Sequence, residues 1–380
     1  MTGRPSVLLF LAPTAQRLAF ESRKAADFFL IYFRSNRNSH LKNIEKIAVA
    51  PMMDWTDRHC RYFMRLLSPG ALLYTEMVTA AAIVHGDSER FLRFNEEEHP
   101  VALQLGGSDP DWMARATALA SGCGYDEINI NVGCPSDRVQ SGRFGACLMA
   151  EPQLVAACYA AMQKETDVPV TVKSRIGINE QDSYEFLRAF IDPLAGAGCR
   201  KFVVHARIAI LEGLSPKENR SVPPLDYERV YRLKEDLPEL DIVLNGGLES
   251  IGQVESALQH VDGVMIGRKA YHEPYALAEL ERHFHPEWQA PSRGEVVDRM
   301  VPYIDREVAA GVPLNRMTRH MLGLFAGQPG ARAWRRFISE HAHRDGAGSE
   351  VLVNALNAMP ATAPTFTMID PETARTRPET

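Results

Sequence analysis

Residues 127–135 read EININVGCP, a run that predicts a strand buried on both faces and ended by Gly-Cys-Pro. Apolar runs of the same kind recur along the chain, and several of them end in glycine. They cover residues 46–52, 72–78, 101–107, 170–177, 201–207, 241–247 and 262–268. Continuous β-branched and aliphatic runs are typical of a parallel sheet that is covered on both sides.

Helix-like segments separate these runs. The clearest cover residues 109–122, 151–166 and 250–261, and two of them begin with typical helix starts, SDP at 108–110 and SIGQ at 250–253. Eight strands that alternate with helices predict an α/β fold, a (β/α)₈ TIM barrel. A doubly wound open sheet is the alternative, but eight runs fit a closed barrel better.

The sequence divides into four parts. The barrel is expected over residues 44–290, and a small C-terminal helical domain, rich in arginine, over residues 291–346. Residues 1–43 form a basic N-terminal extension without a clear core pattern, for which we expect a disordered segment. Residues 347–380 form a tail, and its part after Met359, which is rich in Pro and Thr, is expected to be loose.

Composition narrows the class of protein. A hydrophobic share of 45% and a charged share of 24% are ordinary for a globular protein, and the apolar runs are too short to span a bilayer. The six cysteines include no CxxC pair, so we expect no metal site and no disulfide framework. We therefore expect a monomer in the cytoplasm, away from membranes. Because the net charge is −6, any nucleic acid must bind to a local basic face.

Polar residues gather where the predicted strands end. Barrel enzymes carry their chemistry at this end, and phosphates often bind at the loops after strands seven and eight. The residues at these strand ends are Pro51, Met52, Met53, Gln104, Asn129, Asn131, Lys173, Arg175, His205, Arg207, Asn245, Gly246, Gly247, Gly267 and Arg268. The glycines and Arg268 predict a phosphate site. A buried Lys173 without an acidic neighbour is costly unless it meets an anion.

Cys134 differs from the other cysteines because it follows a strand, between Gly and Pro, in a polar loop. A thiol with an ordinary pKa is mostly protonated at neutral pH, so Cys134 could donate a proton; with a basic partner it could instead be a nucleophile. The sequence leaves both open. Cys60, Cys123, Cys158 and Cys199 are expected to be small buried hydrophobes, and Cys147 is also expected to pack in the core.

Six blocks of this sequence, in order and with their spacing intact, resemble the tRNA-dihydrouridine synthases, specifically the A subfamily. They are APMMDWTDRHCRYFMR (50–65), NVGCPSDRVQSGRFGACLM (131–149), VTVKSRIG (170–177), FVVHAR (202–207), LSPKENRSVPPLDYERVYRLK (214–234) and NGGLES with VDGVMIGR (245–250 and 261–268). The resemblance spans residues 47–346.

The resemblance implies a flavin enzyme that reduces D-loop uridines of tRNA, around positions 20 and 20a, to 5,6-dihydrouridine, with NADPH as reductant. It places the FMN contacts on Pro51, Met52, Met53, Gln104, Lys173, His205, Asn245, Gly246, Gly247, Gly267 and Arg268, and the proton donor on Cys134. RNA contacts fall on Asn131, Lys217 and Arg220, with Arg316 and Arg319 as candidates in the helical domain. The flavin N5 would pass a hydride to C6 of a flipped uracil while Cys134 protonates C5.

Two other functions are compatible with parts of the sequence. A flavin barrel acting on free pyrimidines would share the hydride chemistry and the phosphate site, but would not need the SPKENR segment at 215–220 or the basic helical domain. A non-catalytic RNA-binding protein would carry no yellow flavin. A phosphate-binding isomerase is disfavoured, because no paired carboxylates stand at the predicted strand ends. No GxGxxG motif opens a helix, so a separate dinucleotide domain is not expected.

Overall fold

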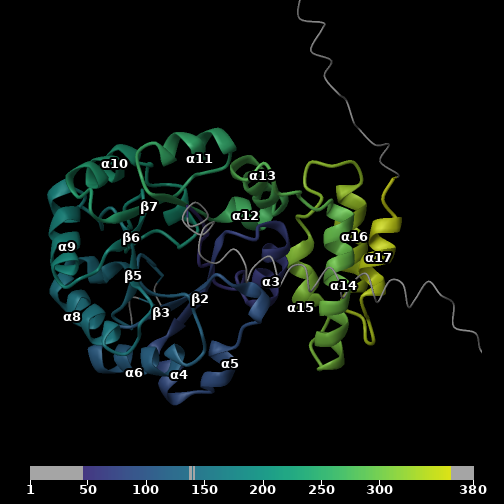
Figure 1. Ribbon diagram of the computed structural model, residues 1–380, viewed down its shortest axis with the longest axis horizontal. Helices are drawn as coiled ribbons and strands as arrows, with labels where there is room; N and C mark the ends of the chain where they lie inside the picture. The colour runs from purple at the N-terminus through teal and green to yellow at the C-terminus, as the bar shows by residue number, and fades with distance from the viewer. Residues whose placement is uncertain (1–45, 137–138, 140–141, 361–380) are drawn as a thin grey trace, which may run out of the picture. The chain divides into compact units, whose positions relative to one another are not determined.

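The computed structural model describes residues 46–136, 139 and 142–360 of the chain. Within them, parallel strands close into an eight-stranded barrel in sequence order, β8 pairing with β1 (Figure 1). The strands are β1 (Ile47–Val49), β2 (Leu72–Thr79), β3 (Val101–Gly106), β4 (Glu127–Val132), β5 (Val170–Arg175), β6 (Lys201–His205), β7 (Asp241–Asn245) and β8 (Gly263–Ile266). The predicted (β/α)₈ barrel is confirmed, and the open doubly wound sheet is excluded. The N-terminal extension expected at 1–43 lies outside the described residues.

Helices surround the barrel. They are α3 (Arg58–Leu67), α4 (Ala80–His85), α5 (Ser88–Leu92), α6 (Pro110–Ser121), α8 (Pro152–Gln163), α9 (Tyr184–Gly196), α10 (Tyr227–Asp236), α11 (Ile251–Leu258), α12 (Arg268–His272) and α13 (Tyr275–Phe284). The two predicted helix starts are confirmed. The Asp109 carboxylate accepts from the first backbone N–H groups of α6, and Ser250 and Gln253 form a capping box at the start of α11.

Alternation along the strands produces two apolar clusters. One lies between the strands and the surrounding helices and holds Phe190, Phe202 and Leu244. The other, smaller cluster fills the interior of the barrel and includes Tyr74 and Val243. Successive side chains of a strand face opposite sides, so every second residue points into the barrel. Near the C-terminal ends of the strands, these inward-pointing residues include polar ones.

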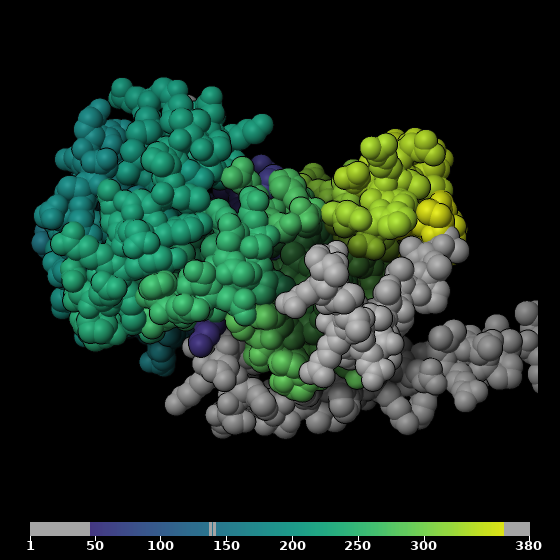
Figure 2. Space-filling view, turned by 90° about the horizontal axis from the view of Figure 1, so that it is seen from above, coloured from purple at the N-terminus to yellow at the C-terminus, as the bar shows by residue number. Residues whose placement is uncertain are grey.

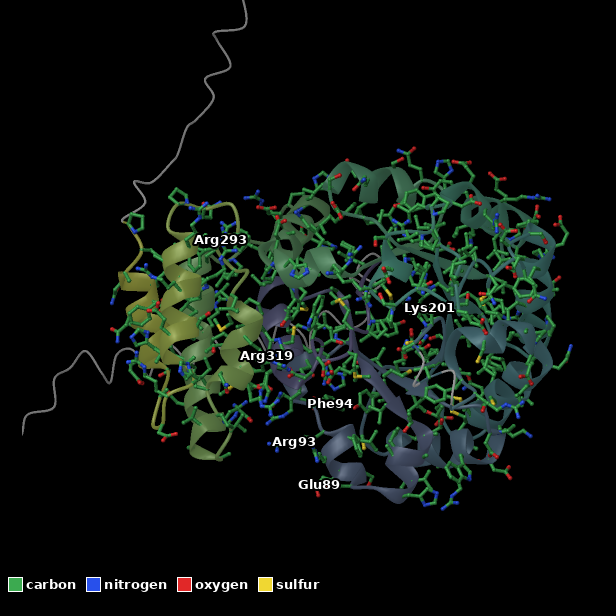
Figure 3. All side chains as sticks on the ribbon, turned by 180° about the vertical axis from the view of Figure 1, so that it is seen from behind. Glu89, Arg93, Phe94, Lys201, Arg293 and Arg319 are labelled. Carbon is green, nitrogen blue, oxygen red and sulfur yellow. The ribbon has the colours of Figure 1, made fainter. Side chains whose placement is uncertain are left out.

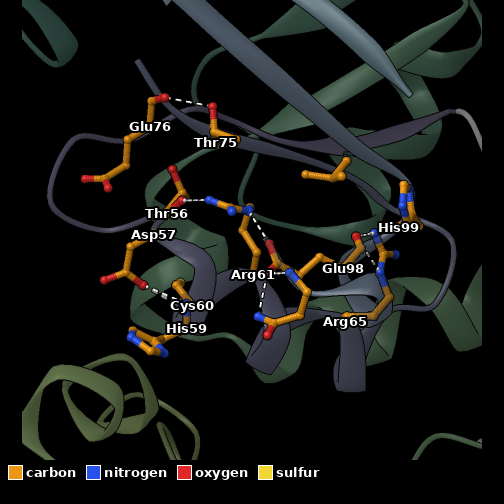
Figure 4. Close-up of polar contacts among 12 residues, drawn as sticks. Thr56, Asp57, His59, Cys60, Arg61, Arg65, Thr75, Glu76, Glu98 and His99 are labelled. Atoms are coloured by element: carbon orange, nitrogen blue, oxygen red, sulfur yellow. Dashed lines mark hydrogen bonds and ion pairs between the residues drawn. The ribbon is translucent and has the colours of Figure 1, made fainter. Parts of the chain in front are cut away.

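Buried arginines of α3 fix the chain that leads into β2 against the chain that leads into β3 (Figure 4). The guanidinium of Arg61 donates to the Glu98 carboxylate, with 2.6 Å between Nε and Oε2, and both side chains are buried. The guanidinium of Arg65 donates to backbone carbonyls, among them those of Ser68 and Pro100. These bonds tie the end of α3 to the chain that leads into β3.

The chain after β8 and α13 is helical, as expected, with α14 (Arg293–Ala309), α15 (Asn315–Thr318), α16 (Ala331–His341) and α17 (Glu350–Asn357). Trp334 of α16 is fully buried, and its indole N–H donates to the carbonyl of Met321 at 3.0 Å. The last helices form the yellow-green surface in Figure 2. In the described residues (46–136, 139 and 142–360), no helix is long and apolar enough to cross a membrane.

The helical region continues past the boundary expected at residue 346. Helix α17 begins at Glu350, and its Leu352 is fully buried. Residues Val351, Leu352 and Ala355 share one face of this helix, and burying that face stabilises the helical region. Residues 361–380 lie outside the described part of the chain.

Candidate active site

The C-terminal ends of the strands bring most of the predicted site residues to one end of the barrel. Gln104, Lys173, His205 and Asn245 lie on β3, β5, β6 and β7. Pro51 to Met53 directly follow β1, Cys134 follows β4, and Gly267 and Arg268 follow β8. Parallel strands carry their C-terminal ends to the same rim, so the fold itself assembles this group. We call this rim the mouth of the barrel.

Cationic side chains crowd the mouth. Lys173 is half-buried in a site where desolvation, with repulsion from Arg175, lowers its pKa to about 7. Burial, together with the charges of Arg220 and Arg207, lowers the pKa of Arg175 to about 10, although the neighbouring Cys134 acts in the opposite direction. The pKa of His205 is held well below its usual value by burial and then by the charges of Arg175 and Lys173. Each group disfavours the charged form of the next.

None of these groups has an acidic partner among the described residues. Lys173, Arg175, His205, Arg207, Arg220 and Arg268 take no part in the ion pairs of that part of the chain. The Nε of Arg207 is buried and has no hydrogen-bond partner there. An uncompensated group of cations is costly, and a bound anion would remove the cost. The mouth therefore fits a ligand with phosphate and further negative charge.

The loop after β7 gives this ligand a place for close backbone approach. Gly246 and Gly247 both have positive φ, 117° and 68°, which glycine adopts without strain. A Cβ at Gly246 would lie 2.6 Å from Cδ2 of His205, so a larger residue would not fit. Among the described residues, neither glycine N–H has a hydrogen-bond partner. Together with Arg268, these groups suit a phosphate.

The thiol of Cys134 is half-buried in the loop that follows β4. The Cys134 backbone N–H donates to Oδ1 of Asn131 at 3.0 Å, and its Sγ lies 3.5 Å from the hydroxyl oxygen of Ser136. The same Asn131 oxygen accepts from the N–H of Gly133 at 3.1 Å. Asn131 in turn donates to Oε1 of Gln104 at 2.8 Å, so two predicted ligand contacts are bonded to each other.

Of the other cysteines, Cys60, Cys158 and Cys199 are buried, as predicted. Cys123 is exposed, and the prediction of a buried residue is wrong. Its position explains this, because α6 ends at Ser121 and Cys123 lies in the turn that leads away from it. Within the described residues, no group of three or more His, Cys, Asp or Glu side chains could hold a metal ion.

The sequence model described as "Dihydrouridine synthase (Dus)" matches residues 48–360. The chain belongs to this family. The chain is 59% identical over 319 residues to the tRNA-dihydrouridine(20/20a) synthase of Shewanella oneidensis, covering 83% of this chain and 95% of that protein. It is 60% identical over 317 residues to the protein of the same name from Vibrio cholerae, with coverage of 83% and 97%. For the protein of that name from Escherichia coli K12 the identity is 58% over 313 residues, with coverage of 82% and 90%.

A solved structure titled as a complex of 2-naphthoyl-CoA reductase with 2-naphthoyl-CoA aligns with a TM-score of 0.49 and 11% identity. The alignment covers 63% of this chain and 50% of that one. A likeness at this level carries no argument about function.

In this member of the dihydrouridine synthase family, the remaining predicted residues lie apart from the mouth or at its edge. Lys217 and Arg220 are exposed on the segment between β6 and α10, and Arg268 donates to the Arg220 carbonyl at 3.1 Å. Arg316 and Arg319 lie after α14. Arg316 is exposed, and none of the side-chain bonds of the described residues involves its guanidinium.

Arg319 has a partner within the protein. Its guanidinium donates to Oδ2 of Asp57 at 2.7 Å, and His320 contacts the same carboxylate at 3.1 Å. Asp57 is also the N-cap of α3, where it accepts from the N–H groups of His59 and Cys60 (Figure 4). Arg319, labelled in Figure 3, therefore ties the C-terminal helices to the barrel.

Sequence reasoning missed a set of polar residues inside the barrel below the mouth. They are Tyr74, Glu127, Thr171 and Lys201, and they bond to one another. A signal was present in the sequence, since Glu127 and Thr171 stand two residues before Asn129 and Lys173, on the same side of their strands.

Proposed function

We propose that this protein reduces uridines at positions 20 and 20a of tRNA to 5,6-dihydrouridine, with FMN bound at the mouth and NADPH as the reductant. The observation that carries the proposal is the 58–60% identity to proteins named tRNA-dihydrouridine(20/20a) synthase, over 90–97% of their length. We expect it to act on tRNA in the cytoplasm.

The cations of the mouth support a flavin mononucleotide. Gly246, Gly247, Gly267 and Arg268 would hold the phosphate, and Pro51 to Met53, Gln104 and His205 would contact the rest of the cofactor. Lys173 would face the pyrimidine end of the ring, which carries negative charge in the reduced flavin. When bound, reduced FMN supplies the hydride that C6 of the uracil receives.

Cys134 supplies the matching proton. A uracil that has gained a hydride at C6 carries negative charge at C5, which is neutralised when the Cys134 thiol gives up its proton there. The described residues offer Sγ a hydroxyl, from Ser136, and no imidazole or carboxylate within bonding distance. Lys173 and Arg175 interact electrostatically with Cys134 and would stabilise the thiolate that remains once the proton has been given up. Asn131 would help to hold the base.

The exposed Lys217, Arg220 and Arg316 would contact phosphates of the tRNA. The target base must be flipped out of its loop to reach the barrel mouth, and extraction is cheaper from a loop than from a duplex. No GxGxxG motif opens a helix, so NADPH would reach the flavin at the same mouth before the RNA enters.

The proposal is tested with the purified chain and tRNA from a strain that lacks this protein. The protein should be yellow, should oxidise NADPH when tRNA is added, and should place dihydrouridine at positions 20 and 20a, as mapped by mass spectrometry. Reduction of free uracil or uridine without tRNA would favour a free-pyrimidine enzyme instead. A colourless protein that binds tRNA and consumes no NADPH would favour a non-catalytic RNA-binding role.

A further inference from the structure

A buried carboxylate stands at the lower end of a continuous chain of hydrogen bonds inside the barrel. Glu127, the first residue of β4, is buried and accepts from the ammonium group of Lys201 at 2.8 Å. The same carboxylate accepts from the hydroxyl of Tyr74 and, at 2.7 Å, from the hydroxyl of Thr171. Lys201 is labelled within the barrel in Figure 3. The three partners of Glu127 all donate to it, so its carboxylate oxygens act only as acceptors.

The chain of hydrogen bonds continues from Thr171 to the loop after β4 that holds Cys134. The amide nitrogen of Asn129 donates to Oγ1 of Thr171, and Gln104 Nε2 donates to Oδ1 of Asn129, both at 2.8 Å. Asn131 Nδ2 donates to Oε1 of Gln104 at 2.8 Å. The Asn131 oxygen is then left to accept the backbone N–H of Cys134 and of the glycine before it.

The direction of every bond in this chain is set by its two ends. The Glu127 carboxylate can only accept, and the backbone N–H of Cys134 can only donate. Because the Thr171 hydroxyl donates its proton to Glu127, its oxygen must accept from Asn129. Each amide of the chain must then point its nitrogen towards Glu127 and its oxygen towards Cys134. Asn129, Gln104 and Thr171 are fully or nearly fully buried, at 0–1% exposure, so water does not offer an alternative partner.

We propose that Glu127, Thr171 and Asn129 are positioning residues which act through Gln104 and Asn131 to hold the Cys134 loop, and so the thiol, in place. The inference rests on the proposed function in so far as Cys134 is the proton donor. It assigns roles to interior residues that do not touch the thiol, of which Asn129 reaches the mouth through its bond to Gln104.

Breaking the chain at Thr171 should therefore reach Cys134. In Thr171→Val the Asn129 amide loses its acceptor and is free to turn over. If the Asn129 amide turns over, its nitrogen faces the nitrogen of Gln104, and two donors then oppose each other. The Gln104 amide turns over to relieve this clash, and Asn131 must then turn over as well. Asn131 would then present a donor to the N–H of Cys134, and the loop would lose its two backbone bonds.

The test compares the flavin-loaded wild-type protein with Thr171→Val, Thr171→Ser and Thr117→Val. Thr171→Ser keeps the hydroxyl and should behave as wild type. Thr117 is a matched control, since it is fully buried and its hydroxyl donates to the Met113 carbonyl within α6, far from this chain of bonds. Asn129→Leu breaks the same chain at a second point and replaces Thr171→Val if that variant does not fold.

Two readouts separate positioning from a general loss of stability. The first is the rate at which iodoacetamide alkylates Cys134, measured by mass spectrometry of its peptide; we expect a several-fold increase in Thr171→Val only. The second is the solvent deuterium isotope effect on reoxidation of the reduced enzyme by tRNA. We expect that step to slow roughly 10–100-fold in Thr171→Val, with a larger isotope effect, because a small misplacement of a reacting group has a cost of this order.

Equal alkylation rates and equal isotope effects in Thr171→Val and Thr117→Val would overturn the proposal. A Thr171→Ser variant as impaired as Thr171→Val would overturn it too, because the hydroxyl would then not be the cause. If the wild-type protein transfers no hydride to tRNA, the proposed function fails, while the alkylation rates still decide whether the chain of bonds holds Cys134.

Discussion

The Nζ of Lys173 lies 3.0 Å from Oδ1 of Asn245, so the side chain of a β5 residue reaches past β6 to the end of β7. This bond to a neutral amide satisfies one of the three donors of an ammonium group. Burial and the charge of Arg175 lower the pKa of Lys173 to about 7. The site is thus built around a cation that the protein alone does not neutralise.

Binding of FMN at pH 8 should be accompanied by uptake of close to one proton per protein. Lys173 is mostly neutral at pH 8 in the flavin-free protein, and the negative charge of the cofactor raises its pKa. Isothermal titration calorimetry in buffers of different ionisation enthalpy measures the uptake. It should fall towards zero at pH 6, where Lys173 is already charged, and at pH 8 in Lys173→Met. The exposed Lys164→Met is the control and should leave it unchanged.

Replacing Cys134 with Ala should slow reoxidation of the reduced enzyme by tRNA roughly 10²–10⁴-fold, the usual contribution of a positioned general acid. Reduction of the flavin by NADPH should stay within about twofold of wild type, since the proposed flavin contacts lie on other strands. Rapid-mixing spectroscopy follows the two half-reactions separately. Equal damage to both would mean that Cys134 serves the cofactor or the fold.

The strands could be predicted because a barrel strand is buried on both faces and its sequence shows this directly. The predicted runs extend past the observed ends, as in 170–177 against Val170–Arg175, because apolar residues continue into the loops. Helix α17 was missed because it is short and its apolar face is recognisable only once it packs on its neighbours.

The mouth could be predicted from residues at strand ends, but the hydrogen bonds below it could not. Gln104, Asn129 and Thr171 meet only when the barrel closes, and each is an ordinary polar residue in its own run. The bond between Arg319 and Asp57 could not be predicted for the same reason, because it depends on how α3 and the C-terminal helices pack.

The Asp57 carboxylate should make the protein sensitive to acid. Burial opposes its ionisation, yet bonds and charge from His320, and bonds from the Cys60 N–H and Arg319, lower its pKa well below the usual range. A depressed folded-state pKa contributes stability above the ordinary pKa of Asp, near 4, and this stability is lost as the pH falls below it. Asp57→Asn should lose roughly 1.5–3 kcal/mol at pH 7 and show a flatter decline from pH 5 to 3, measured by chemical denaturation.

Arg319 and Arg316 lie three residues apart, and substitution of each should have a different effect. Arg319→Met should lower the melting temperature by several degrees, since it removes a partner of the part-buried Asp57. Arg316→Met should leave the melting temperature unchanged and weaken tRNA binding, because its guanidinium is exposed and free of partners among the described residues. Unchanged tRNA affinity in Arg316→Met would remove it from the proposed RNA-binding surface.

Selection of the uridine should depend on phosphate contacts beside the mouth. Lys217 and Arg220 are exposed on the segment between β6 and α10, and Arg220 lies close enough to Arg268 for their charges to interact. Replacing both with Met should weaken tRNA binding and flatten its dependence on salt. The slope of log affinity against log salt should fall by roughly one to two, as expected for two lost phosphate contacts. NADPH should still reduce the flavin at a near-normal rate, because the flavin phosphate keeps its glycines and Arg268.

Lys164→Met with Arg200→Met is the control, since Lys164 ends α8 and Arg200 precedes β6, at the opposite end of the barrel. Binding is measured across a salt series, together with mapping of dihydrouridine. An unchanged affinity and slope in the Lys217 and Arg220 double variant would place the docking surface elsewhere, and modification outside positions 20 and 20a by the wild type would refute the proposed site choice.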